Sequence, residues 1–186
     1  DAIVVGRYVG KEALASVGGS TSQIINLVVG FFVGLSSGTT VVIAQFYGAR
    51  DQKNINRALH TAIAFSIAGS IVITILGLLF SPFFLQLMQT PQNLMADSTL
   101  YLRVYFAGIF FVFIYNIGSG ILRATGDSRR PLYFLIVCCF LNIILDVVFV
   151  VGLHMAVAGV ALGTLISQGV SAVLVLIALF RSRDIF

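Results

Sequence analysis

The sequence predicts an all-α fold, a polytopic bundle of transmembrane helices with about five complete spans. Hydrophobic residues make up 59% of the chain and charged residues only 10%, whereas a soluble domain carries about 25% charged residues. The few charges are also clustered, so that residues 13–49, 58–96 and 147–180 contain none. Each of these runs is long enough to cross a bilayer. A water-soluble globule is therefore excluded.

The expected spans follow from dividing the apolar runs at glycine, proline and charge clusters. We place them at about residues 20–46, 57–88, 100–124, 131–151 and 158–180. They are apolar on all faces, as expected for helices surrounded by lipid and other helices. Residues 1–10 are expected to be the end of a truncated first helix.

The second span is longer than one crossing requires. Ser81-Pro82 lies near its end, and proline removes a backbone donor from a helix. We therefore expect a break in the helix at this dipeptide.

Lysine and arginine are concentrated in alternate connections between the spans. Residues 50–57 and 123–130 hold three each, whereas residues 91–97 and 152–158 hold none. Cytoplasmic connections carry the excess of these residues, so five spans that begin outside and end inside are expected. The net charge of +4 then reflects membrane topology, and no nucleic-acid partner is expected.

Asp146 is the only acid inside the five expected spans. An ionisable group in that position costs about 2.5–3.5 kcal/mol, so it points to a function. Asn142 precedes it by four residues, which puts both side chains on one helix face. Carboxylate and amide oxygens are the hard ligands that a cation such as Na⁺ prefers, and a carboxylate can instead carry a proton.

Three further polar residues are expected at a similar depth in the outer half of the membrane: Asp1, Asn26 and Thr164. This estimate uses the helical rise of about 1.5 Å per residue. The alternative for Asn142 and Thr164 is a purely structural role as interhelical hydrogen bonds, each worth about 0.6 kcal/mol.

Other side chains carry weaker functional predictions. Tyr105, Phe110 and Tyr115, together with Asn26, are candidates to line an apolar cavity for a drug-like molecule, and packing is the alternative. The two histidines lack partners at metal-ligand spacing, so no metal site or cofactor is expected. Hydrolase motifs are also missing from the sequence, which favours a transporter over an enzyme.

Four stretches of sequence carry a resemblance to a known family. They are residues 1–7 (DAIVVGR), 38–51 (GTTVVIAQFYGARD), 122–131 (LRATGDSRRP), and 141–146 (LNIILD) followed by 159–164 (GVALGT). In order and spacing, over all 186 residues, they resemble the multidrug and toxic compound extrusion (MATE) transporters.

The resemblance implies a twelve-helix secondary transporter of two six-helix lobes. Such an antiporter exports cationic amphipathic drugs or toxic metabolites in exchange for Na⁺ or H⁺. Residues 1–186 would form a partial amino-terminal lobe, with helices two to six complete and the carboxy-terminal lobe missing. The expected partners are small cationic organic substrates, the lipid bilayer and the missing lobe. A prokaryotic cytoplasmic membrane is the expected location.

The same resemblance implies roles for individual residues. Asp1, Asn142, Asp146 and Thr164 match the cation-coupling positions of the family, with Na⁺ and H⁺ both open. Independently of the resemblance, the residue types of the RATGD segment (residues 123–127) predict a hinge between helices, where Gly126 takes a left-handed conformation and Asp127 or Ser128 caps the next helix.

Two alternative functions stay open. One is a lipid-linked oligosaccharide flippase of the same superfold, whose cavity would be strongly cationic to hold pyrophosphate. The sequence disfavours it, because Arg103 is the only basic residue well inside a span. The other is a structural subunit that transports nothing, which would need no buried acid.

Overall fold

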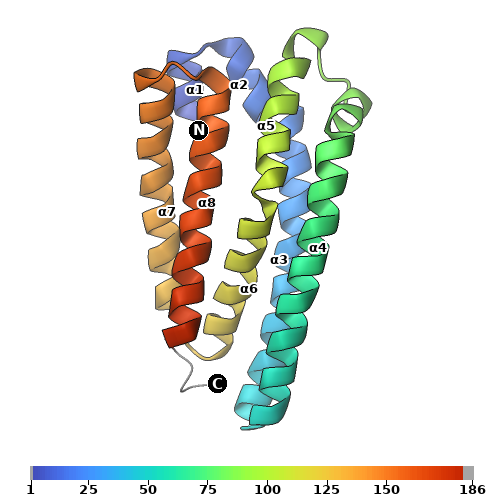
Figure 1. The fold of residues 1–186 in the computed structure, drawn as a ribbon, viewed down its shortest axis with the longest axis vertical. Coiled ribbons are helices and arrows are strands. Elements are labelled where there is room, and N and C mark those ends of the chain that lie inside the picture. The colour runs from blue at the N-terminus through green and yellow to red at the C-terminus, as the bar shows by residue number, and fades with distance from the viewer. Residues whose placement is uncertain (1, 182–186) are drawn as a thin grey trace.

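The structure is a computed structural model that describes residues 2–181, and Asp1 lies outside the described residues. These residues form helices and no strand, and Figure 1 shows their order. The elements are α1 (Ala2–Tyr8), α2 (Lys11–Gly18), α3 (Ser20–Gly48), α4 (Gln52–Leu87), a 3₁₀ turn (Gln92–Leu94), α5 (Met95–Ala107), α6 (Ile109–Ala124), α7 (Arg129–Val147), a π-helical turn (Val148–Gly152) and α8 (Ala156–Arg181).

The predicted polytopic all-α fold is confirmed. Within the described residues, four segments are long and apolar enough to cross a membrane, namely α2 with α3, α4, α7 with its π-helical turn, and α8. The fifth is the consecutive pair α5 and α6, which bends by 45° at Gly108.

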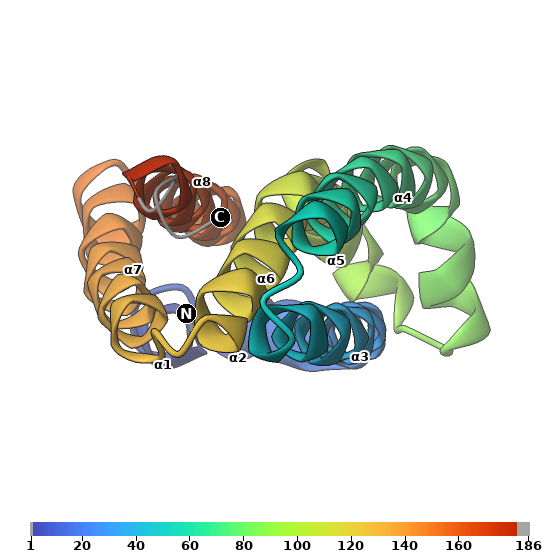
Figure 2. The same ribbon diagram turned by 90° about the horizontal axis from the view of Figure 1, so that it is seen from below.

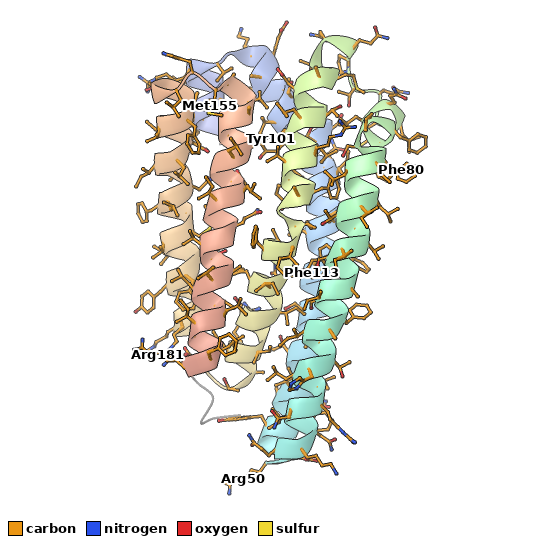
Figure 3. The ribbon with its side chains drawn as sticks, in the orientation of Figure 1. Arg50, Phe80, Tyr101, Phe113, Met155 and Arg181 are labelled. Atoms are coloured by element: carbon orange, nitrogen blue, oxygen red, sulfur yellow. The ribbon has the colours of Figure 1, made fainter. Side chains whose placement is uncertain are left out.

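The long helices run side by side, and their connections alternate between two ends of the bundle (Figure 1). One end, which we call the basic end, holds Arg50, Arg123, Arg130 and Arg181. Figure 3 shows Arg50 and Arg181 at this end and Met155 at the opposite, far end. By the positive-inside rule, the basic end is expected to face the cytoplasm.

Helix α6 lies at the centre of the bundle, between the α7–α8 pair and the α3–α4 pair (Figure 2). It approaches α8 closely at Gly118, where an added Cβ atom would clash with the side chain of Val175. It also approaches α3, because the Ser36 hydroxyl donates to the Asn116 carbonyl at 2.7 Å. Small residues and interhelical hydrogen bonds of this kind hold helices together in lipid, where burying apolar surface gives little driving force.

The predicted break at Ser81-Pro82 is wrong, because α4 continues through Pro82 to Leu87. Proline cannot donate to the carbonyl four residues earlier, which belongs to Leu78. That carbonyl instead accepts a hydrogen bond from Nε of Arg103, at 3.2 Å, from the neighbouring helix α5. The arginine thus replaces the donor that proline removes, and the helix stays intact.

We expect Arg103→Gln to lower the free energy of unfolding of the full-length protein by about 1 kcal/mol or less, since the hydrogen bond that it removes is exposed. Pro82→Ala restores the backbone donor to Leu78. In a protein that carries Pro82→Ala, Arg103→Gln should therefore lower the free energy of unfolding by less than it does in wild type. A double-mutant cycle on melting temperatures measures the difference. Additive effects of the two substitutions would contradict the compensation.

The third expected span is divided at Gly108 into α5 and α6. A Cβ atom at Gly108 would lie 2.6 Å from Cδ1 of Leu165, so α8 passes close to the break. Beside it, the Thr74 hydroxyl of α4 donates to the Phe106 carbonyl at 3.1 Å. The bend is therefore supported by contacts from two other helices.

The connection between α6 and α7 contains both of the predicted local conformations. Gly126 has a φ of 92°, the left-handed conformation expected after the helix. Oδ1 of Asp127 accepts a hydrogen bond from the backbone N–H of Arg130 at 3.2 Å, which caps the start of α7. Both predictions for this segment are confirmed.

Candidate ion-binding site

Asp146 is completely buried, with 0% of its surface exposed, in the last turn of α7. Directly after it the helix widens into the π-helical turn, in which the Leu153 N–H donates to the Val148 carbonyl at 3.0 Å. Turns of this kind are frequent at functional sites because they redirect neighbouring side chains. Helix α8 packs against this turn, since a Cβ at Gly159 would lie 2.9 Å from Cβ of Phe149.

The Asp146 carboxylate lies directly against the backbone of α8. A Cβ atom at Gly163 would be only 2.7 Å from Oδ1 of Asp146, so this position has room for glycine alone. Gly163 is itself buried. The close approach of α7 to α8 therefore sets the position of the carboxylate.

Asn142, one helical turn before Asp146 in α7, contacts Thr164, which follows Gly163 in α8. The Asn142 amide donates to the Thr164 hydroxyl at 3.4 Å, a long hydrogen bond between α7 and α8. Both residues are half-buried. The structure thus brings Asn142, Asp146 and Thr164 to one interface between two helices, whereas spacing and depth predicted only a shared helix face and a shared depth.

Tyr101 completes the group from a third helix, and the sequence reasoning missed it. This residue of α5 is 5% exposed. Its hydroxyl lies within hydrogen-bonding reach of Thr164 and close enough to Asp146 to interact electrostatically. Figure 3 shows Tyr101 between α5 and α8, toward the far end. Its position near the outer end of the expected 100–124 span was a depth signal that could have identified it.

Apolar residues cover this site toward the far end. They are Val5, Ala13, Val17, Val150, Val157, Val160 and Ala161, which form one buried cluster with the ring of Tyr101. Such surroundings exclude water and strengthen electrostatic interactions inside the site.

None of the four residues that we expected to line a cavity belongs to the candidate ion site. Asn26 is exposed on α3, and no contact described here joins its side chain to the group. Phe110 is 37% exposed, and half-buried Tyr105 lies beside Gln168. The Tyr115 hydroxyl donates to the Pro131 carbonyl at 2.9 Å, which links α6 to α7.

A groove that is separate from the candidate ion site lies on the surface. It has a volume of 640 Å³ between α3 and α4 near the basic end, with Gly34 and Gly38 on one side and Arg57 and Thr61 on the other. Its lining includes neither Asp146 nor its neighbours. The described residues therefore keep this groove and the buried carboxylate separate.

The donor atoms of the site suit a small hard cation. A carboxylate, an amide and two hydroxyl groups are oxygen ligands of the kind that bind Na⁺, and the carboxylate alone can hold a proton. Within residues 2–181, no three His, Cys, Asp or Glu side chains gather where they could hold a metal ion.

A helical membrane bundle with an acid buried between its helices is typical of a multi-pass membrane transporter. The chain belongs to the MatE family, whose sequence profile matches residues 1–148. The resemblance to MATE transporters is thereby confirmed. The chain is an integral membrane protein with several spans, as expected.

Known relatives match nearly the whole chain, which spans about 40% of their own length. The probable multidrug resistance protein YoeA of Bacillus subtilis is 34% identical over 97% of this chain, which spans 40% of that protein. A solved inward-facing multidrug resistance MATE transporter is 30% identical, with a TM-score of 0.92 over 98% of this chain and 41% of its own. An outward-facing structure gives 0.89 at 31% identity over 98% of this chain and 40% of its own. The fold is therefore similar to the matched part of such transporters in both conformations.

Proposed function

We propose that the full-length protein exports small cationic, amphipathic compounds across the cytoplasmic membrane in exchange for Na⁺ or H⁺. In this proposal the residues described here provide the ion-coupling site. The observation that carries it is the buried Asp146 carboxylate, which lies against Gly163 beside the contact between Asn142 and Thr164. The relatives named as multidrug resistance proteins support export of drug-like molecules.

The site offers a physical route for coupling. A bound Na⁺ or proton neutralises Asp146, which removes most of the cost of holding a charge between α7 and α8. Without the ion, a packing of the helices that admits water to the carboxylate becomes more favourable. An ion that binds one packing more tightly than the other shifts the equilibrium between them. Asp1, which lies outside the described residues, is proposed as a further ligand.

The flippase alternative has less support. The reported relatives are named for multidrug resistance. Arg103, the basic residue that we considered for a phosphate-binding cavity, donates to the Leu78 carbonyl and supports helix α4 instead.

The test is transport of a fluorescent lipophilic cation by the full-length protein in proteoliposomes. A Na⁺ gradient and a pH gradient are imposed separately, and an ionophore that collapses each gradient is the control. We expect one gradient to drive movement of the cation against its own concentration. If the fluorescent cation moved as fast after both gradients had been collapsed as it did before, exchange would be contradicted.

A further inference from the structure

A second groove lies between α7 and α8 at the basic end, and neither the ion site nor the proposed transport uses it. Its volume is 390 Å³, within the range of about 300–1,000 Å³ typical of small-molecule sites. Its lining consists of Arg130, Phe134, Leu174, Ile177, Ala178 and Arg181. The groove thus has an apolar wall and two guanidinium groups.

The two arginines come from different helices. Arg130 lies in the first turn of α7, and Arg181 is the last residue of α8. Figure 3 shows Arg181 at the basic end. Nε of Arg130 also pairs with Oδ2 of Asp127 at 3.0 Å. Asp127 thus offsets one of the two guanidinium charges that line the groove, and a net positive charge remains.

The rest of the lining is apolar, and part of it is exposed on the surface of the described residues. Phe134 and Leu174 are half-buried, and Ile177 is 51% exposed. Tyr133, next to Phe134, is 61% exposed. Exposed tyrosines of membrane helices gather at the level of the lipid headgroups. The arginines, which lie at the helix ends beyond this aromatic pair, are therefore at headgroup level.

We propose that this groove binds one anionic phospholipid. The lipid phosphate pairs with Arg130 and Arg181, since guanidinium groups bind phosphate with two parallel hydrogen bonds. One acyl chain lies along Phe134, Leu174 and Ile177. Basic pockets between membrane helices on the cytoplasmic side bind anionic lipid headgroups in this way. A zwitterionic lipid lacks the net charge, and free phosphate lacks the chain.

The experiment is native mass spectrometry of the full-length protein in detergent, titrated with dioleoyl phosphatidylglycerol or dioleoyl phosphatidylcholine. The test variant is Arg130→Gln with Arg181→Gln. The matched control, Arg50→Gln with Lys53→Gln, removes the same charge from the α3–α4 connection at the same end. We expect phosphatidylglycerol to bind about tenfold or more weakly to the test variant than to the control, since each basic residue near an anionic lipid contributes several-fold.

Two further measurements separate the proposed site from general attraction to the basic end. Arg130→Lys with Arg181→Lys keeps both charges and should retain most of the binding, which also shows that the groove tolerates substitution. Glycerol phosphate should not compete with the lipid. Equal losses in the test and control variants, or full competition by glycerol phosphate, would overturn the proposal.

Discussion

Asp146→Asn is expected to lower ion-driven export by the full-length protein at least about tenfold. Asparagine has nearly the same shape as aspartate, but it neither carries a proton nor neutralises a bound Na⁺. The ion would then no longer bind one helix packing more tightly than the other, and coupling requires that difference. The measurement is the initial rate of export of a fluorescent cation under an imposed Na⁺ or pH gradient.

Asp97→Asn is the matched control, because Asp97 is an exposed acid in the first turn of α5. It removes the same charge outside the site, and its export rate should stay within about twofold of wild type. Melting temperature separates function from folding. Asp146→Asn removes a fully buried ionisable group, so the variant should be at least as stable as wild type. Normal gradient-driven export by this variant would exclude Asp146 as the coupling group.

Gly163→Ala is expected to have the second largest effect, with export reduced by up to about 100-fold, since a displacement of about 1 Å at a reacting group can cost that much. The added Cβ would lie 2.7 Å from Oδ1 of Asp146, which is too close for either atom to keep its place. The carboxylate or helix α8 must therefore move. Export and the Na⁺ or H⁺ dependence of the rate are measured together.

Gly169→Ala on the same helix is the control for this substitution. Its Cβ would meet only the Phe111 ring, at ordinary contact distances of 3.9 Å and above. Alanine is the better helix former by about 1 kcal/mol, so this variant should be active and at least as stable as wild type. If both alanine variants exported at the wild-type rate, the contact between Gly163 and Asp146 would have no role in coupling.

Hydropathy and charge alone indicated the number of membrane segments and their order. The span expected at 20–46 lies within α3, Ser20–Gly48. The physical reason is that lipid offers backbone groups no hydrogen bonds, so a long apolar run must be helical. Interruptions of the helices were harder to predict. Pro82 leaves α4 intact because Arg103, distant in sequence, replaces the missing donor, whereas Gly108 marks a bend that we did not anticipate.

Some features of the candidate site could likewise be predicted from the sequence, whereas others depend on the tertiary structure. Spacing put Asn142 and Asp146 on one helix face, and the helical rise put Thr164 at the same depth. The same rise grouped Asn26 with them, yet Asn26 is exposed on α3. Tyr101 was missed although it lies beside Thr164.

Depth along a membrane helix was thus readable from the sequence, because each residue adds a constant rise. Rotation of a helix about its axis was not, because it depends on where neighbouring helices can approach. Gly163 and Gly118 permit such approaches, and they decide which side chains of α8 face α7 and α6. Only the tertiary structure therefore shows that Asp146 lies against Gly163 and that Asn142 contacts Thr164 across the interface between α7 and α8.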